Sequence, residues 1–586
     1  MTKGETSLDR RAVICATVLA AALFCTLAAA AVARGIIAQS YPELMQPFIA
    51  WLPESTPVGI AVAAVTAIIL GVCAYFLFSR FSRVHAALSR FAGPNFLALG
   101  FSKRSVIVAA VILFVVWLPI LIIMFPTGLT ADTLNQLYQF QTHAPTLYPT
   151  TEEIINAEFI DHHPVFDTLL YGAFWSIGNA MGSQNAGLFI LVIVQSVILA
   201  AELGALVCYL DRLGVPWVLR CAALVFFALF PFFAHYAATI LKDVTYLTVF
   251  IPWTIMWLEA ARTRGAVFDD KRFLVAFFVL GGLGIITKKL GLFVLVPCLV
   301  ALVVIMRGRR LPLAVGSIVT VVVFSAILPA IVYPAIGGVA PGGRQETLGP
   351  AIQQMTALLR DTPDALTSEE LEAVNRVFDV EAAKDAYEAP RTDGAKSMFK
   401  SSATTDDIVR FMQIWAAQGI RHPGTYLMST AMTAGMLYVP SLKLTYYSGE
   451  DLEARALDYA ATNPDYAVNV YQPEDLIALN DRLEFDSIES AISDLPVISL
   501  FFTSGFYGSW VPLIALISVI FARKRVDARL RDRAPLLVFA LVPTIVCCAF
   551  LIVSPVASPR YILPLLFTAP LLLGWAWFAL KEQTAD

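Results

Sequence analysis

The sequence predicts an all-α polytopic membrane protein with about 12 transmembrane helices, an outer interfacial or re-entrant helix and an inserted, mainly helical external domain. Of its 586 residues, 58% are hydrophobic and only 15% are charged, against roughly 25% charged in an ordinary soluble protein. The mean hydropathy of +0.71 agrees. These values exclude a soluble enzyme and a disordered chain. The net charge of −4 also excludes a nucleic-acid-binding protein, because it offers no basic field for a phosphate backbone.

Twelve apolar segments match or nearly match the length of a spanning helix, which is about 20 residues. They lie at residues 13–36, 57–79, 105–124, 186–209, 217–235, 244–261, 273–287, 289–306, 311–336, 498–521, 535–553 and 560–580. The first ends in Ala-Val-Ala-Arg, which resembles a signal-peptidase site. Because its apolar run exceeds the usual signal core of about 7–15 residues, we expect a retained membrane anchor.

Basic residues concentrate in a few of the connections between these segments. Cytoplasmic loops of membrane proteins carry an excess of Lys and Arg. The basic stretches lie at residues 3–11, 80–104, 262–272, 307–310 and 523–533. We therefore expect all five on the cytoplasmic side of a cytoplasmic membrane, with both termini cytoplasmic.

A thirteenth apolar segment, residues 164–182, is interrupted by Asp167, Tyr171 and Trp175. If it crossed the membrane, every later basic stretch would move to the outside. The charge pattern therefore predicts that it lies along the outer interface or re-enters the membrane. Its Tyr and Trp residues are typical of the headgroup layer.

Three regions follow from this topology. Residues 1–337 form an N-terminal transmembrane region with an external loop at 125–185, and residues 498–586 form a C-terminal transmembrane region. Between them, residues 338–497 are external and hold 25 of the 45 acidic but only 12 of the 41 basic residues. This length suits a small domain of its own. Helices are expected within it near 351–360, 367–378, 405–419, 450–461 and 474–492.

Two polar clusters fall in the external loop 125–185. Asp132 suits a general base for a hydroxyl group, or alternatively an N-cap for the helix that follows. Asp161, His162 and His163 precede Pro164; they either cap the helix that starts there or bind a substrate hydroxyl and move a proton. Asp132, Asp161 and His162 are an alternative binding site for a divalent metal cofactor. Their spacing is not typical of a metal site, so no metal ligand is assigned.

Two further clusters place lysines at the expected outer ends of spans. Lys242 and Asp243 are adjacent, so they either neutralise each other or mark a functional site at the membrane surface. Lys288 and Lys289 form an outer turn, where positive charge runs against the orientation rule. They indicate a bound anion, or else side chains that extend to the interface.

The last cluster, Arg560-Tyr561, begins the final span at the outer face. A guanidinium group suits phosphate because its fork of donors is planar and permanently charged. The alternative is an interfacial anchor made by the two side chains.

Carboxylates and cations gathered on one outer face predict sugar transfer from a polyprenyl-phosphate donor. The leaving phosphate needs fixed cations, and the acceptor hydroxyl needs a carboxylate to take its proton. We therefore interpret Asp132 and Asp161 as candidate catalytic residues. The candidate substrate-binding residues are His162, His163, Lys242, Asp243, Lys288, Lys289, Arg560 and Tyr561.

These features resemble the GT-C superfamily of membrane glycosyltransferases. The shared pieces are an Asp in the first large external loop, the His163-Pro164 element opening a short juxtamembrane helix, and a late Arg-Tyr at the outer face. The resemblance implies Asp132 as general base, and Arg560, Lys242 and Lys288 as ligands of the lipid phosphate. One difference is that the external domain precedes the last three spans, whereas in that superfamily it usually follows the last.

The chain resembles still more closely an uncharacterised family of bacterial multi-pass membrane proteins, over roughly residues 100–580. The matching pieces are Asp161-His-His-Pro164, Leu241-Lys-Asp243, Lys288-Lys-Leu-Gly-Leu-Phe-Val-Leu-Val-Pro297, Gln353-Gln354, Arg421-His-Pro-Gly-Thr-Tyr426 and Ser558-Pro-Arg-Tyr561. This second resemblance implies a bacterial cell envelope and a shared fold.

The sequence thus favours an inverting, hexosyltransferase-type enzyme at the outer face of the membrane. Its expected partners are a polyprenyl-phosphate-linked sugar and membrane lipids, with no nucleic acid. One alternative is a transporter or flippase of a lipid-linked sugar, for which Glu202 inside a span is the best single residue. Another is a polymerase or ligase of surface polysaccharide.

Overall fold

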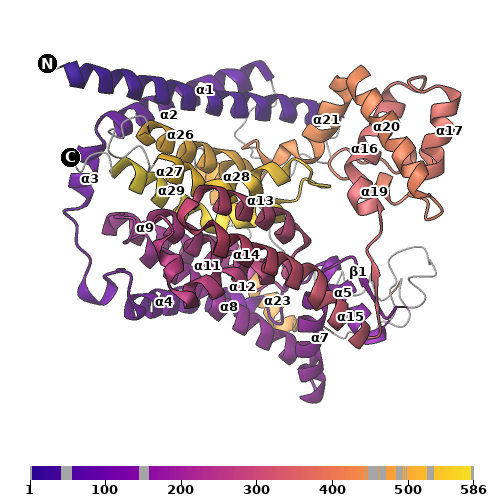
Figure 1. Ribbon diagram of the computed structural model, residues 1–586, viewed down its shortest axis with the longest axis horizontal. Helices are drawn as coiled ribbons and strands as arrows, with labels where there is room; N and C mark the ends of the chain where they lie inside the picture. Colours follow the sequence, from indigo (N-terminus) through magenta and orange to yellow (C-terminus); the bar gives the residue numbers. More distant parts are fainter. Residues whose placement is uncertain are drawn as a thin grey trace.

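The computed structural model describes residues 3–40, 56–143, 157–440, 442–445, 472–483, 498–523 and 534–581, together with residues 461, 470, 492, 493 and 495. These residues form an elongated bundle of helices with a smaller helical domain at one end (Figure 1). Within them, seven helices are long and apolar enough to cross a membrane, or eight if one bent pair counts as a single span. The protein is therefore an all-α membrane protein.

The seven candidate spans coincide with predicted segments. They are Arg10–Gly35, Thr56–Ser79, Lys103–Ile123, Gln184–Tyr209, Lys242–Arg262, Arg307–Ala335 and Pro559–Lys581. The bent pair is Trp217–Leu229 (α9) and Pro231–Ala237 (α10), which meet at 55°. Helices at the other predicted segments are shorter, so the number twelve stays a prediction. The basic stretch 523–533 lies outside the described residues except for Arg523.

The centre of the bundle is formed by α11 (Lys242–Arg262) and α29 (Leu563–Lys581), which pack against each other. Trp257 and Trp575 are fully buried there. Their indole N–H groups donate to the carbonyls of Phe539 and Leu537, at 3.1 and 3.0 Å. Burial of these aromatic rings holds α11 and α29 in register, so the residues at the start of each helix emerge at the same end of the bundle.

Other helices surround this centre. α1 (Lys3–Ser40) and α2 (Thr56–Ser79) form a hairpin along one side (Figure 1). The remaining membrane-region elements are α3 (Phe81–Leu88), η2 (Asn95–Leu97), α4 (Lys103–Ile123), α8 (Gln184–Tyr209), η3 (Ala266–Asp269), α12 (Lys271–Thr287), α13 (Lys289–Ile305), η4 (Arg307–Arg309), α14 (Arg310–Val322), η5 (Val323–Ile327), α15 (Leu328–Ala335), α25 (Ile498–Phe501), η7 (Phe506–Trp510), α26 (Val511–Arg523), α27 (Ala534–Phe539), α28 (Val542–Leu551) and η9 (Pro559–Ile562).

One end of the bundle carries α5 (Ala131–Thr142), β1 (Phe159–Asp161) and α7 (Val165–Ala180), and we call it the α5 end (Figure 1). β1 pairs in parallel with β2 (Val339–Pro341), so that Asp161 lies opposite Pro341. α7 corresponds to the segment expected at the interface. It has 16 residues, is not among the seven candidate spans and packs against α8.

The helical domain at the α5 end has its own apolar core between residues 348 and 426. It consists of α16 (Gln345–Asp361), α17 (Ser368–Val377), α18 (Val380–Asp385), α19 (Asp393–Lys396), α20 (Thr405–Arg421) and α21 (Pro423–Thr433), followed by η6 (Gly435–Leu437). Capping boxes at Thr367 and Thr404 start α17 and α20. The helices predicted near 351–360, 367–378 and 405–419 are confirmed.

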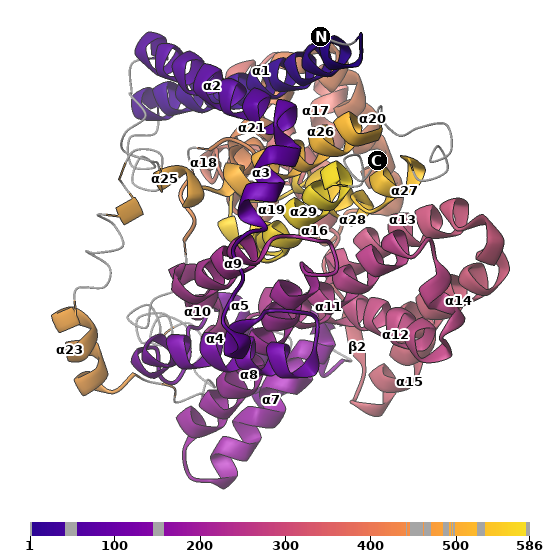
Figure 2. The same ribbon diagram turned by 90° about the vertical axis from the view of Figure 1, so that its left-hand side faces the viewer.

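The chain after this domain takes a different course. α23 (Glu474–Leu483) lies apart from α16–α20, at the lower left of the view (Figure 2). Just before it, the Gln472 side chain donates to the carbonyl of Ile123 at the end of α4, at 2.6 Å. Most of the predicted helix 450–461, and the second half of 474–492, lie outside the described residues.

Candidate functional site

Threonine hydroxyls attach α5 to the start of α11. Thr130 caps α5, since its hydroxyl accepts from the Thr133 backbone N–H at 3.2 Å. The Thr133 hydroxyl donates to the carbonyl of Ile240 at 2.7 Å, and the Thr127 hydroxyl to that of Ala238 at 2.8 Å. Thr130 is thus the cap, and the alternative that Asp132 serves as the N-cap is wrong. Asp132 lies in the first turn, where its side chain is available for other contacts.

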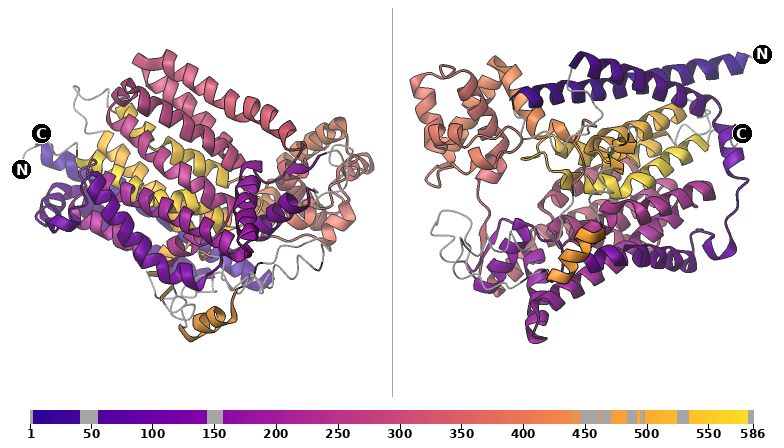
Figure 3. Two further views of the ribbon diagram at one scale, coloured as in Figure 1. Left: turned by 90° about the horizontal axis from the view of Figure 1, so that it is seen from below. Right: turned by 180° about the vertical axis from the view of Figure 1, so that it is seen from behind.

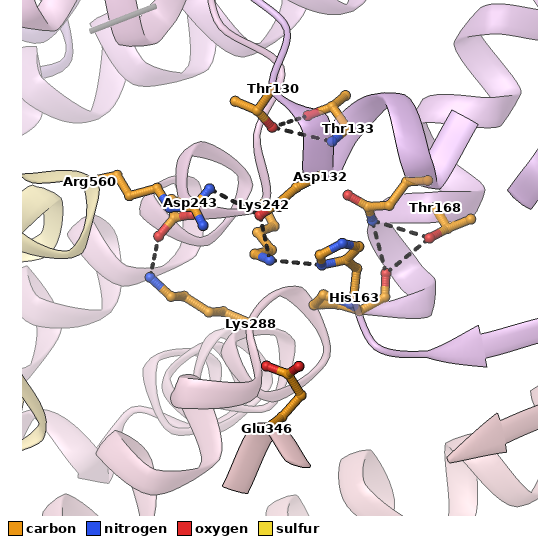
Figure 4. Close-up of polar contacts among 12 residues, drawn as sticks. Thr130, Asp132, Thr133, His163, Thr168, Lys242, Asp243, Lys288, Glu346 and Arg560 are labelled. Carbon is orange, nitrogen blue, oxygen red and sulfur yellow. Dashed lines mark hydrogen bonds and ion pairs between the residues drawn. The ribbon is translucent and has the colours of Figure 1, made fainter. Parts of the chain in front are cut away.

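Asp132 joins three distant segments of the chain (Figure 4). One of its oxygens, Oδ2, lies 2.9 Å from Lys242 Nζ on α11 and 3.0 Å from Arg560 Nη1 on η9. Burial alone would raise the pKa of this carboxyl group, but the charges of Lys242 and Arg560 outweigh burial and hold its pKa well below the ordinary value. Asp132 is therefore an ionised acceptor at neutral pH.

Lys242 also contacts His163, with its Nζ 2.8 Å from His163 Nδ1. Burial lowers the pKa of His163 well below its ordinary value, and the charge of Lys242 lowers it further. His163 is therefore a neutral ring that accepts a hydrogen bond from the ammonium group. The ring of His162 lies 4.2 Å from that of His163, centroid to centroid. Burial lowers the pKa of His162 to about 4.

Asp243 forms the second ion pair of the cluster, with Lys288 at the junction of α12 and α13 (Figure 4). Both side chains are buried, with 1% and 8% of their surface exposed. The Lys288 Nζ also lies 5.7 Å from the ring centres of Tyr246 and Tyr561. Neutralisation of Lys242 by its neighbour Asp243 is therefore the wrong interpretation, because each has a partner on another segment. Lys288 likewise does not extend to the interface.

Asp161 and Lys289 form a separate pair beside this cluster. Lys289 Nζ lies 3.5 Å from Asp161 Oδ2 and also contacts the Asp161 backbone carbonyl. Burial raises the pKa of Asp161, and the charge of Lys289 partly offsets that rise. Asp161 ends β1, while α7 is preceded by Pro164 with no side-chain cap. The interpretation of Asp161 or a histidine as the cap of α7 is therefore wrong.

The structure adds a residue that the sequence reasoning missed. Glu346 at the start of α16 pairs with Lys396 at 2.8 Å, and its charge acts on His162. Figure 4 shows its carboxylate pointing toward the cluster. The observation that could have pointed to Glu346 is its position in the chain. It follows five residues after β2, whose last residue pairs with Asp161. That signal was hidden because the surrounding region is rich in acidic residues.

Asp167 and Gln136 lie in the layer between α5 and α7. The Gln136 side chain donates to the Thr168 hydroxyl at 3.1 Å and connects the two helices. Asp167 is fully buried, and burial raises its pKa well above the ordinary value. Within the described residues, no group of three or more His, Cys, Asp or Glu side chains is placed to hold a metal ion.

Comparisons with curated proteins and with solved structures found no match. A family model, described as a family of unknown function, does match, and it covers residues 8–586. The match extends over nearly the entire chain, from before the first span to the last residue, and it confirms the expected membership of an uncharacterised family. The chain therefore belongs to the family of unknown function DUF6020.

Proposed function

We propose that this protein is a GT-C-like, inverting glycosyltransferase. It moves one sugar from a polyprenyl-phosphate donor to an acceptor at the outer face of a bacterial cytoplasmic membrane, which it spans about twelve times. The observation that carries the proposal is the position of Asp132, held between Lys242 and Arg560 at one end of the helix bundle.

The charge balance of the cluster supports a phosphate ligand. In the cluster, three cations (Lys242, Lys288 and Arg560) face two carboxylates (Asp132 and Asp243). The Asp161–Lys289 and Glu346–Lys396 pairs beside it add no net charge. One positive charge is therefore in excess. An anion that binds there gains charge-assisted hydrogen bonds in a partly desolvated site, where they are stronger than in water.

The proposed reaction is a single displacement. The acceptor hydroxyl oxygen forms a bond to the anomeric carbon, and the bond from that carbon to the phosphate oxygen breaks. Polyprenyl phosphate leaves with the electron pair, and Asp132 takes the hydroxyl proton. A phosphate that draws Lys242 and Arg560 away from Asp132 also raises the basicity of the carboxylate, because it removes the charges that lower its pKa.

Transport of a lipid-linked sugar is the second candidate, favoured by one residue. Glu202 lies inside α8, and within the described residues its Oε2 has no hydrogen-bond partner. Carboxylates at such depth often mark a transport path. A polysaccharide polymerase or ligase would differ from the proposed enzyme only in its acceptor.

The decisive test replaces Asp132 by Asn in the full-length protein. Sugar transfer from a radiolabelled polyprenyl-phosphate sugar to membrane acceptors should fall to background, while native mass spectrometry still detects donor binding. Asp269→Asn is the matched control, since Asp269 pairs with Arg309 but takes no part in the cluster. Full transfer by Asp132→Asn would remove the general-base role, and movement of the intact donor across vesicles without transfer would favour the transporter.

A further inference from the structure

A large apolar cavity lies next to the cluster. Its volume is about 580 Å³, and it is lined by parts of α7, α12, α13, η5 and α15. Asp161 and Lys289 contribute polar groups to the lining, whereas Leu169, Phe293 and Leu328 make it apolar. The volume falls within the range of about 300–1,000 Å³ that is typical of ligand sites. The cavity therefore combines one charged pair with a hydrocarbon-like interior.

The outer wall of this cavity faces the membrane. It belongs to the span Arg307–Ala335, of which only 6% is buried, and which lies at the edge of the bundle when the protein is seen from below (Figure 3). Ile331 on this wall is 65% exposed. A ligand that enters beside such a wall comes from the hydrocarbon phase, and it must therefore be apolar along most of its length.

The wall is locally irregular where it lines the cavity. Val323–Ile327 is a π-helical turn between α14 and α15, and Phe324 and Ser325 from this turn contribute to the lining. Short π-helical turns within α-helices are rare and frequently occur at functional sites. On the opposite side, a Cβ atom at Gly282 of α12 would overlap the Phe324 ring, so the glycine sets how close the wall lies to the bundle.

Size and charge together select one kind of occupant. The cavity is large enough for a few isoprene units of one hydrocarbon chain. A phospholipid brings two chains to one headgroup, whereas a polyprenyl phosphate brings a single chain. Lys289, 49% exposed and next in sequence to Lys288, places a cation between the cavity and the cluster.

We propose that this cavity holds the phosphate-proximal part of the donor's polyprenyl chain, with Lys289 as the cation that meets the phosphate. Asp161 is then a positioning residue that holds the Lys289 side chain at the entrance. The proposal rests on the proposed function for the identity of the lipid. It extends that function by assigning a chain-binding site and by making Lys289 a phosphate ligand.

The test fills the cavity in the full-length protein. Leu328→Trp places a large ring in the lining, and Ile331→Trp is the matched control, because Ile331 lies on the same helix but outside the lining. Native mass spectrometry would titrate each protein with a long-chain polyprenyl phosphate, with geranyl phosphate and with phosphatidylglycerol. Leu328→Trp should weaken long-chain binding by about tenfold or more, since several methylene groups are excluded. Geranyl phosphate, with only two isoprene units, should be weakened less than the long-chain lipid, and Ile331→Trp should match the unaltered protein.

Two results would overturn the proposal. One is long-chain binding that is unaffected by Leu328→Trp, and the other is phosphatidylglycerol binding in the same cavity as tightly as the polyprenyl phosphate. A photoreactive polyprenyl phosphate gives a second measurement on the unaltered protein. It should label peptides from α7, α13 and α15, and labelling confined to other helices would contradict the site.

A separate pair of variants tests whether Lys289 binds the phosphate group. Lys289→Met should weaken binding of polyprenyl phosphate but not of the uncharged polyprenol, while Lys271→Met, at the other end of α12, should change neither. Equal effects of Lys289→Met on both lipids would remove its phosphate-binding role. Because all these readouts measure binding, they separate the two proposals. Lipid binding in the cavity, together with no sugar transfer in the assay of the proposed function, would contradict only the proposed function. Long-chain binding unaffected by Leu328→Trp would contradict only the cavity.

Discussion

Lys242 binds Asp132, 110 positions away in the sequence, and does not bind the adjacent Asp243. The two neighbours point to different partners, because consecutive residues on a helix lie about 100° apart around its axis. Lys242 therefore reaches Asp132 on α5 and His163 just before α7, whereas Asp243 reaches Lys288 at the start of α13. This arrangement turns one dipeptide into the connection between four segments of the chain.

The Lys242–Asp132 pair predicts a measurable coupling in stability. Lys242→Met should destabilise the protein by about 1–3 kcal/mol, less than the roughly 3–5 kcal/mol for breaking a fully buried pair, because both side chains are partly exposed. Adding Asp132→Asn should cost less than it does in the unaltered protein, since the carboxylate has then already lost one of its two cationic partners. Denaturant unfolding in detergent, arranged as a double-mutant cycle, measures the coupling. Strictly additive effects would show that the two side chains do not interact.

Lys288 and Lys289 are adjacent, but their replacement should destabilise the protein to very different extents. Lys288→Met should lower the free energy of unfolding by about 3–5 kcal/mol, because it leaves Asp243 ionised and unpaired where only 1% of its side chain is exposed. Lys289→Met should cost about 0–1 kcal/mol, since its pair with Asp161 is half exposed. Melting temperatures from intrinsic fluorescence compare the two variants directly. Equal destabilisation would contradict the different burial of the two pairs.

The histidine pair predicts how stability depends on pH. The pKa of His162 is lowered by burial to about 4, whereas an unfolded chain has a histidine pKa of about 6.5. Between these values the unfolded state binds the proton and the folded state does not. Stability is therefore fully present above about pH 6.5 and falls as the pH drops toward 4, by on the order of 3 kcal/mol.

His162→Asn should make this part of the stability curve less steep, and the slope that remains should come from His163, whose pKa is also lowered. The control is His85→Asn, because His85 lies on α3 rather than at the α5 end. Unfolding experiments at half-unit intervals from pH 4 to pH 8 provide the measurement. A curve that stays equally steep in His162→Asn would assign the pH dependence to another group. The carboxyl group of Asp132 does not interfere, because its pKa lies well below its ordinary value and its effect falls at lower pH.

Much of the candidate site could be predicted because its residue types are unusual where they occur. Lysine and arginine at span ends that the charge pattern predicts to be outer are exceptions to the orientation rule, and this exception is enough to single out Lys242, Lys288 and Arg560 in the sequence. The choice of partners could not be predicted, since it depends on how α5, α11 and η9 pack. The cap at Thr130 and the approach of Glu346 also depend on the tertiary fold. Short helices such as α12 and α28 show why the number of spans is harder to predict than their existence.

Arg560 provides the last prediction, on binding of the donor. Its guanidinium contacts Asp132 through Nη1 and lies 5.4 Å from the ring centre of Tyr561, so it is held in place from two sides. Arg560→Ala should weaken binding of a polyprenyl-phosphate sugar by about tenfold or more, because charge-assisted hydrogen bonds to phosphate contribute roughly 1.5–3 kcal/mol each. Arg560→Lys should recover only part of this affinity, since an ammonium group lacks the planar pair of donors. Native mass spectrometry measures both variants against Arg309→Ala, whose side chain pairs with Asp269 outside the cluster. Binding of ordinary phospholipids alone, unchanged in Arg560→Ala, would contradict a phosphate site at this arginine and favour the transport function.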